Sequence, residues 1–277
     1  MSNTSKKVRV IQYIIFILIA ITMIAPFIYA FAISLQGPGL AYKSPPVLFK
    51  PPFMWSNYTT VLTKYDFVRY FGNTLLITAI YMIGGVISNS MIAFGFAKYD
   101  SSKGINALFN IGLCTMYVPS VAMMIPMYVI WAKVGALDTY IPLTLGAFFG
   151  SIGWIFLIRQ NFKNLSNSFF EAAYIDGANP LYIWWKIYMP LVRPIIATVI
   201  LRIFMQEWNN LMNPLLYITT KSKYTVSLAM AALKADAVGR PEIQMAGAII
   251  MIIPVIIVYM FAQKHFIGGL AAGGDKG

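Results

Sequence analysis

The sequence predicts an all-α integral membrane protein with six transmembrane helices. Hydrophobic residues make up 59% of the 277 residues and charged residues only 11%, which is less than half the charged share of a typical soluble domain. Six apolar blocks are each long enough to cross the hydrocarbon core of a bilayer. Backbone groups in lipid must bond within their own segment, and the alternation of barrel strands is absent, so we expect helices.

The first apolar block has a start that resembles a signal peptide. Three basic residues precede it, namely Lys6, Lys7 and Arg9, and Ala30-Phe31-Ala32 fits a small-x-small cleavage pattern. The apolar run from Ile11 to about Ala32 nevertheless exceeds the ~7–15 residues of a signal core. We therefore expect a retained first span that follows a short N-terminal segment, residues 1–9.

The six expected spans lie at residues 10–33, 73–97, 107–131, 140–157, 195–217 and 245–266. Together they form one transmembrane domain over residues 10–266. The connection from about Ser34 to Phe71 contains two Pro-Pro pairs, which predicts an irregular loop outside the membrane. The connection at residues 158–191 carries the most informative motif, and a glycine-rich tail at residues 267–277 ends the sequence.

The orientation follows from the first span rather than from the total charge. With both termini inside, eleven basic residues lie on inner segments and nine on outer loops, a difference that decides nothing. The basic cluster directly before the first span favours cytoplasmic termini, because the first helix usually dominates. The connection at 158–191 is then cytoplasmic too. The net charge of +12 reflects loops that flank spans, and we expect no nucleic-acid partner.

The segment Glu171–Pro190, EAAYIDGANPLYIWWKIYMP, carries the local signals of two short helices. Ser168 and Glu171 have the spacing of a capping box, so a helix should begin there. Gly177 can supply the left-handed residue that ends this helix about two turns later. The sequence therefore predicts a short helix followed by a sharp glycine turn.

A second helix is expected to begin directly after that turn. Asn179 can serve as its N-cap, with Pro180 at the first helical position. We expect it to run to about Met189, where Pro190 stops it. The fifth span should follow.

The side chains of the first helix allow two interpretations. Four small or aromatic residues cluster on one side of it, namely Phe169, Phe170, Ala173 and Tyr174. Such a surface suits a groove on another protein. The alternative is a helix that lies on lipid at the membrane edge, which Trp184, Trp185 and Lys186 of the second helix favour. The residues alone leave both open.

The same segment resembles the EAA–G–I-LP loop of ABC importer permeases. The matching residues are Glu171, Ala172, Ala173, Gly177, Ile187 and Pro190, and Met189 stands where the family usually has Leu. The segments EWNNLMNPL and FIGGLAAGGDKG resemble the carbohydrate-uptake branch, in particular its maltose-type second permease subunit. The resemblance extends over most of the chain. It implies the type I ABC importer permease fold in the inner or plasma membrane of a bacterial cell.

The resemblance also implies a mechanism and a set of partners. The connection between spans 4 and 5 would form a coupling helix that sits in a cleft of a dimeric cytoplasmic ATPase. The residues implied in this coupling are Glu171, Ala172, Ala173, Tyr174, Asp176, Gly177, Ala178 and Pro190. Because the sequence contains no GxxxxGK[ST] phosphate loop, ATP and Mg would be bound by that ATPase, and no cofactor is expected here. A homologous second permease subunit, giving a heterodimer, and an extracytoplasmic sugar-binding protein complete the expected complex.

The fifth span has an unusual content of polar residues. They are Arg202, Gln206, Asn209 and Asn213, spaced on one helical face, with Asn210 beside them. Facing lipid would be costly, so the stripe should face protein or water. It would then line a translocation path, where amides suit sugar hydroxyls and Trp208 offers a ring for stacking, or it would bond helices of the sister subunit.

Two other classes of protein remain as alternatives. An ion-coupled secondary transporter should show inverted repeats and midplane carboxylates, but Glu207 is the only acidic residue within a span. A membrane assembly subunit that transports nothing is compatible with the composition. An enzyme is disfavoured because no HExxH motif, nucleophile elbow or carboxylate pair is present. We therefore expect no catalytic residue and no metal site.

Overall fold

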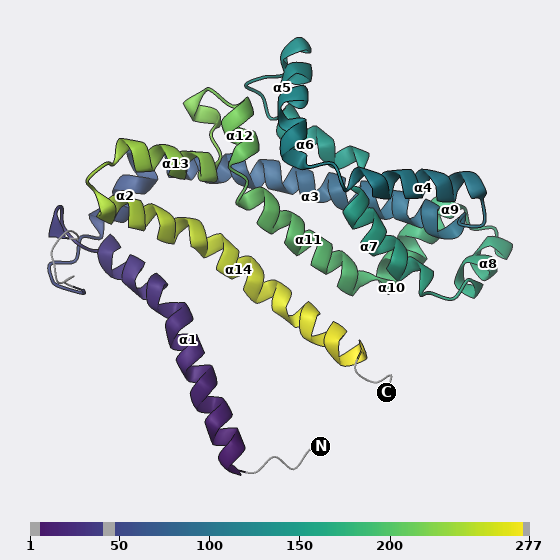
Figure 1. Ribbon diagram of the computed structural model, residues 1–277, viewed down its shortest axis with the longest axis horizontal. Coiled ribbons are helices and arrows are strands. Elements are labelled where there is room, and N and C mark those ends of the chain that lie inside the picture. Colours follow the sequence, from purple (N-terminus) through teal and green to yellow (C-terminus); the bar gives the residue numbers. More distant parts are fainter. Residues whose placement is uncertain (1–5, 41–47, 274–277) are drawn as a thin grey trace. The chain divides into compact units, whose positions relative to one another are not determined.

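A computed structural model describes residues 6–40 and 48–273, and every regular element within these ranges is a helix (Figure 1). The α-helices are α1 (Lys6–Ser34), α2 (Ser56–Thr63), α3 (Phe67–Lys98), α4 (Lys103–Thr115), α5 (Met124–Lys133), α6 (Ile141–Thr144), α7 (Ile152–Lys163), α8 (Ser168–Ile175), α9 (Pro180–Tyr182), α10 (Met189–Leu191), α11 (Arg193–Trp208), α12 (Met212–Tyr217), α13 (Val226–Asp236) and α14 (Pro241–Gly273). Short 3-10 turns lie at Ser120–Met123, Leu145–Phe149 and Lys221–Lys223, and a π-helix lies at Ile183–Tyr188. Part of the predicted N-terminal segment and the end of the predicted tail lie outside the described residues.

The number of spans agrees with the prediction when bent helix pairs are counted. Four helical segments are long and apolar enough to cross a membrane, namely Val8–Ser34, Phe67–Lys98, Ile141–Lys163 and Pro241–Gln263. Two further pairs pass the same test together, which gives up to six spans. The last helix continues to Gly273, so the backbone of residues 267–273 in the predicted tail is helical.

Three of the predicted spans are not single helices. The predicted fourth span consists of α6, a 3-10 turn and α7, with Gly150 and Ser151 between the turn and α7, although it passes the span test as one segment. The predicted third span breaks between Thr115 and Ser120, where the axis turns by 93° ahead of Pro119 and a 3-10 turn. The predicted fifth span ends as a helix at Trp208 and resumes only at Met212. Proline removes a backbone donor and disfavours helix in the residue before it, which accounts for the break in the third span.

The chain divides into two compact units. The first comprises residues 1–68 and 229–254. In it, Asn57 of α2 donates hydrogen bonds to the carbonyls of Ser34 (2.8 Å) and Gln36 (2.9 Å), and the Ser34 and Tyr58 hydroxyls lie 2.6 Å apart. These bonds satisfy carbonyls at the C-terminal end of α1, which have no partner within the helix. They fix α2 against that end.

The second unit comprises residues 69–228 and 255–277 and holds the main core. The core is built by α3, α4, α7, the π-helix and α11. Phe94, Phe162 and Tyr188 are buried at its centre, with ring centroids 5.1 to 6.0 Å apart in edge-to-face geometry. Such aromatic pairs add stability beyond the burial of their area. They hold the π-helix, which follows the motif turn, against the long helix α3.

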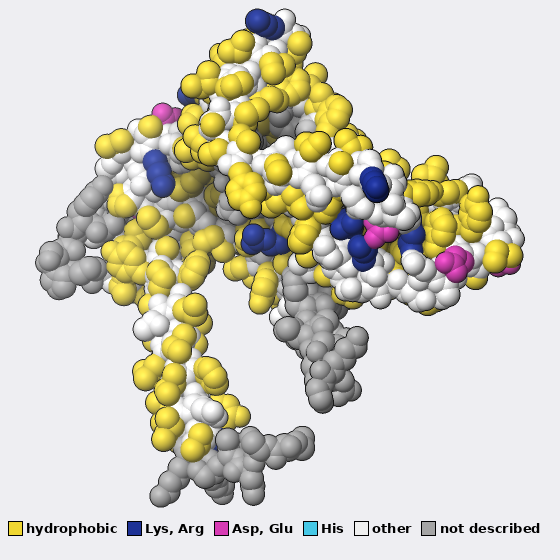
Figure 2. All heavy atoms as spheres, turned by 45° about the vertical axis from the view of Figure 1, so that its right-hand side comes forward, with side chains coloured by type: hydrophobic (Ala, Val, Ile, Leu, Met, Phe, Trp, Pro, Cys, Tyr) yellow, Lys and Arg dark blue, Asp and Glu magenta, His cyan; other side chains and the backbone are white. Residues whose placement is uncertain are grey.

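Much of the surface is apolar, as Figure 2 shows for one face. On α1, nearly every large side chain from Val8 to Tyr29 is exposed. A soluble protein rarely leaves an apolar surface of this extent uncovered. Lipid or partner helices therefore cover it in the assembled protein.

Candidate functional site

The helix predicted at the start of the motif is present as α8, but its N-cap differs from the prediction. Ser168 is already the first helical residue, and the cap position is Asn167, whose side chain does not cap the helix. The predicted capping box is therefore wrong, because the Ser168 hydroxyl stands one position too late to reach the third amide. That hydroxyl lies 2.8 Å from the Ser166 hydroxyl instead, and the Glu171 amide donates to the Asn167 carbonyl.

The predicted glycine turn at the end of α8 is confirmed. Gly177 has a φ of +83°. Its amide donates to the Tyr174 carbonyl (3.1 Å), and the Ala178 amide donates to the Ala173 carbonyl (3.0 Å). These two bonds form a Schellman motif, which needs a left-handed residue at this position.

The second helix begins as predicted and ends later than predicted. Asn179 Oδ1 accepts a hydrogen bond from the Tyr182 amide (2.8 Å), which caps the helix ahead of Pro180. Pro190 does not stop the helix, which continues from the π-helix through α10 to Leu191. The chain turns by 87° at Val192, between Leu191 and Arg193.

One face of α8 is anchored to the second unit's core. Phe170 packs against Phe94 with ring centroids 6.1 Å apart. The Lys98 ammonium donates to Asn167 Oδ1 (3.0 Å) and lies 4.5 Å from the Tyr188 ring centroid and 5.5 Å from that of Phe170. The last residue of α3 therefore joins the start of α8 to the π-helix.

The other face of α8 is open to a partner. Tyr174 and Ile175 are 61% and 84% exposed, and Glu171, Ala172 and Asp176 are exposed as well. The predicted cluster of small and aromatic residues is therefore divided, because Phe170 and Ala173 pack inward while Tyr174 and Phe169 remain accessible.

A concave surface adjoins this open face at the glycine turn. A groove of about 530 Å³ is lined by six residues near the turn, namely Ala173, Asp176, Gly177, Ala178, Asn179 and Tyr182, together with Ile187. Pro190, the last of the predicted coupling residues, is half-buried in α10 beyond this groove.

Three cations near the base of α8 were not singled out by the sequence, and Lys98 is one of them. Lys163 at the end of α7 pairs with Asp100 (2.7 Å), and this ammonium lowers the pKa of the Asp100 carboxyl. Arg159 is buried in α7, where its Nε donates to the Phe96 carbonyl (3.0 Å) and its guanidinium lies 4.1 Å from the Phe109 ring centroid. The four-residue spacing of Arg159 and Lys163, which puts both on one helical face, was an available signal for these two residues.

The polar residues predicted on the fifth span do not share one continuous helix. Arg202 and Gln206 lie on α11, whereas Asn209 and Asn210 fall in the break and Asn213 lies on α12. Asn209 Nδ2 donates to the Met205 carbonyl (2.8 Å), so its side chain provides a partner for a carbonyl in the last turn of α11. The i, i+4, i+7, i+11 pattern is wrong as a single stripe, since the turn after Trp208 changes the register.

Two of these residues have surroundings that bear on their expected roles. Trp208 is fully buried against Phe71 and Phe204, so in this conformation its ring offers no face for stacking. Arg202 lines a groove of about 330 Å³ with Leu201, Met205 and three residues of α14, namely Val255, Ile256 and Tyr259. A role of the set in binding a solute stays a prediction.

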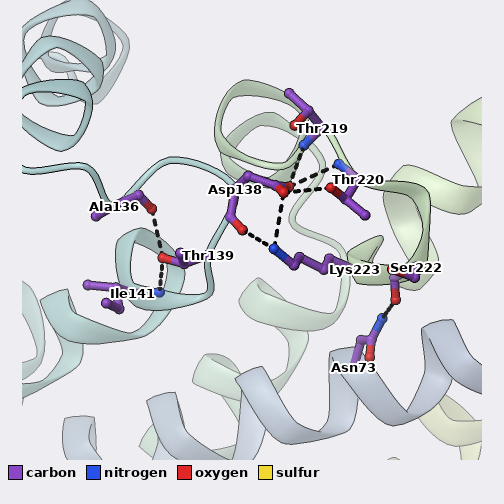
Figure 3. A network of polar contacts seen from close by, with 9 residues as sticks. All are labelled: Asn73, Ala136, Asp138, Thr139, Ile141, Thr219, Thr220, Ser222 and Lys223. Atoms are coloured by element: carbon purple, nitrogen blue, oxygen red, sulfur yellow. Dashed lines mark hydrogen bonds and ion pairs between the residues drawn. The ribbon is translucent and has the colours of Figure 1, made fainter.

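A second polar network lies at the other end of α3 (Figure 3). The Asp138 carboxylate accepts hydrogen bonds from the Thr220 hydroxyl (2.6 Å), from the amides of Thr219 and Thr220, and from the Lys223 ammonium (3.0 Å). These donors, above all the Thr220 hydroxyl, hold the Asp138 pKa well below its usual value. Asn73 of α3 donates to the carbonyls of Ser222 and Tyr224 at 2.9 Å each. The network ties two loops to one end of α3.

No group of three or more His, Cys, Asp or Glu side chains that could hold a metal ion occurs among the described residues. The single cysteine, Cys114, is exposed on α4. The features that the second unit offers are therefore an anchored surface helix, grooves and polar networks.

Comparisons with known proteins agree with this architecture. An alginate-importing bacterial ABC transporter of known crystal structure contains a chain with a TM-score of 0.81 and 27% identity, and the match covers 96% of this chain and 100% of that one. The arabinooligosaccharides transport system permease protein AraQ of Halalkalibacterium halodurans is 30% identical, with 75% of this chain and 74% of the relative covered.

Two relatives from Bacillus subtilis match over more of the length. Protein LplC is 30% identical, covering 93% of this chain and 90% of LplC. The polygalacturonan/rhamnogalacturonan transport system permease protein YtcP is 28% identical, covering 94% and 95%. The family described as binding-protein-dependent transport system inner membrane component matches residues 89–271, which is well over half of the sequence. This chain belongs to that family of membrane transport permeases.

Proposed function

We propose that this chain is a permease subunit of an ATP-driven importer of carbohydrates, namely oligosaccharides or related sugars. The observation that carries the proposal is its membership of the binding-protein-dependent permease family, combined with relatives named as permeases for arabinooligosaccharides and for polygalacturonan or rhamnogalacturonan. The chain is a transporter subunit, and the ATPase activity belongs to a partner.

In this proposal α8 is the coupling helix that docks on the ATPase. Support comes from its two faces, one exposed and one packed on the core. The exposed face would enter a cleft of the ATPase through Ala172, Ile175 and Tyr174, with Glu171 and Asp176 making polar contacts at its edge. Ala178 and Gly177 shape the turn beside that contact, and Pro190 belongs to the segment that leads onward to α11.

The anchoring contacts explain how a movement of the ATPase would reach the spans. Lys98, Phe170 and Tyr188 join α8 to α3 and to the π-helix. These elements would therefore move with α8 as one body. The ATPase dimer would close on ATP and separate after hydrolysis. That rigid-body motion would switch the cavity between inward-open and outward-open states, as in other transitions between packed elements.

The complex needs partners that this chain does not supply. A dimeric ATPase would bind ATP and Mg, because the sequence contains no phosphate loop of its own. A second, homologous permease would complete the translocation path, and an extracytoplasmic sugar-binding protein would deliver the solute. The polar residues of the predicted fifth span would line the path or form hydrogen bonds with the second permease. They are Arg202, Gln206, Asn209, Asn210 and Asn213.

Reconstitution in lipid vesicles tests the proposal. The chain, copurified with its second permease and ATPase, should hydrolyse ATP slowly alone and faster when a loaded binding protein is added. A panel of neutral and acidic oligosaccharides, each with a candidate binding protein, should identify the solute. An ion-coupled secondary transporter would instead accumulate solute under an ion gradient without any ATPase, and an assembly subunit would copurify without stimulating hydrolysis.

A further inference from the structure

A second groove lies where the segment after the motif turn meets α11. It has a volume of about 520 Å³ and is lined by residues of the π-helix, α10 and α11. Six of the lining residues carry the argument below, namely Trp185, Lys186, Met189, Arg193, Ala197 and Ile200. None of them belongs to the exposed face of α8 or to the predicted translocation path.

The bend at Val192 places this groove at a membrane boundary. The segment Pro180–Leu191 and the helix α11 meet at 87°. α11 lies within the predicted fifth span, so a segment perpendicular to it would run along the bilayer surface. Trp185 is half-exposed on this segment, and tryptophan concentrates at the level of the lipid headgroups.

The groove combines two cations with an apolar wall. Lys186 and Arg193 stand on opposite sides of the bend and are both exposed, and the residues that line the groove include no Asp or Glu. From Arg193, the residues Ala197 and Ile200 follow at i+4 and i+7, so they continue the groove along one face of α11. The groove thus combines two exposed cations at the bend with an apolar wall along α11.

We propose that this groove binds one anionic phospholipid. Its phosphate would lie between the Lys186 ammonium and the Arg193 guanidinium, and an acyl chain would follow Met189, Ala197 and Ile200. Basic pockets between helices at the inner membrane surface recognise anionic headgroups. A free phosphate would satisfy the two cations but would leave the apolar wall uncovered, whereas a phospholipid matches both. The bound lipid would brace the bend between the motif segment and α11.

Native mass spectrometry of the whole purified transporter tests this assignment. The complex is incubated with phosphatidylglycerol or with phosphatidylcholine, and the bound lipid is counted. We expect phosphatidylglycerol to be retained preferentially by the native complex. Lys186→Gln and Arg193→Gln should each weaken retention about fivefold, and the double variant about 25-fold, since a basic residue near an anionic lipid contributes a factor of that size.

Further measurements provide a control and test for other occupants of the groove. Lys103→Gln removes an exposed cation outside the groove and should leave retention unchanged. Ala197→Trp fills the apolar wall and should reduce lipid retention while both cations remain. Inorganic phosphate should compete poorly with the lipid.

Four results would overturn the proposal, three of them from lipid retention. These three are equal retention of the two lipids, equal loss in Lys103→Gln and Lys186→Gln, and full competition by inorganic phosphate. Specific cross-linking of an Ala197→Cys variant to the second permease would also overturn it, because the groove would then be a subunit interface.

Discussion

Gly177 sets the geometry of the motif turn through its backbone alone. Its φ is +83°, and no atom lies within 4 Å of the position that a Cβ would occupy. A side chain there meets no steric obstacle, so the cost of a substitution is the strain of a left-handed backbone, about 1 kcal/mol or more. The chain relieves that strain by shifting the end of α8.

We therefore expect Gly177→Val to leave the protein inserted in the membrane but to uncouple ATP hydrolysis from uptake. The measurements are membrane abundance, solute uptake and ATPase activity of the complex. Gly135→Val is a matched control, because Gly135 also has positive φ (+69°) and an unobstructed Cβ position but lies far from α8 in the sequence. Normal uptake in the Gly177 variant would contradict the proposed role of α8.

Asp138 is the residue whose charge contributes most visibly to a local network. Its pKa is depressed in the folded protein, first by the Thr220 hydroxyl and also by the Lys223 ammonium. A depressed carboxyl pKa contributes stability above the unfolded-state pKa of about 3.9, and that contribution is lost as the pH falls toward the folded-state value. The stabilisation by the Asp138 carboxylate is therefore fully present at neutral pH.

Asp138→Asn should lower the melting temperature of the purified complex at pH 7. Asn keeps one acceptor but leaves Lys223 without its charged partner. The difference from the native protein should shrink below about pH 4, because Asp138 then becomes protonated in the unfolded state while it stays ionised in the folded protein. Thermal unfolding between pH 7 and pH 3 measures this change. Asp236→Asn, at the exposed end of α13, is the control, and an equal, pH-independent effect of both variants would refute this account.

At the scale of elements, α8 is a helix with one face for the core and one for a partner. Phe170 and Ala173 pack against the core, and Ile175 on the other side is 84% exposed. A half-buried aromatic ring contributes to folding stability, whereas an exposed residue contributes little in the isolated chain. Substitutions on the core face should therefore lower stability, whereas substitutions on the exposed face should affect binding of the ATPase.

Phe170→Ala should lower the free energy of unfolding by about 2 kcal/mol, less than the 3–5 kcal/mol of a fully buried ring. Ile175→Asp should change stability by less than about 0.5 kcal/mol yet prevent copurification of the ATPase. Thermal unfolding and pull-down of the ATPase measure the two effects. The prediction fails if Ile175→Asp binds the ATPase normally, or if both variants lose stability equally.

The elements also show what the sequence could predict. Hydropathy located all six apolar blocks, and Gly177 and Asn179 signalled the turn and the second helix, because these features depend on a few neighbouring residues. Hydropathy could not reveal the breaks at residues 116–119 and 209–211, although Pro119 and the pair Asn209-Asn210 were available signals. The division of α8 into two faces depends on Phe94 and Tyr188, which lie far away in the sequence.

At the scale of the second unit, the two polar networks define the ends of α3. Asn73, near its start, is bonded to residues 222 and 224, and Asp138 joins the same loop. Lys98, at its end, is bonded to Asn167 before α8. A helix of 32 residues is about 48 Å long and exceeds the ~30 Å hydrocarbon core. Loops 133–140 and 217–224 therefore share one membrane side, and α8 lies on the other.

Labelling with a membrane-impermeant thiol reagent decides which side is which. Cys114 is replaced by Ala, since it is exposed and would react, and single cysteines are placed at the exposed positions Ser101 and Ser222. The basic cluster before α1 predicts cytoplasmic termini, so intact cells should label Ser222→Cys, whereas Ser101→Cys should react only after permeabilisation. The reverse pattern would put α8 outside the cell, where no ATPase could reach it, and coupling through that helix would then be impossible.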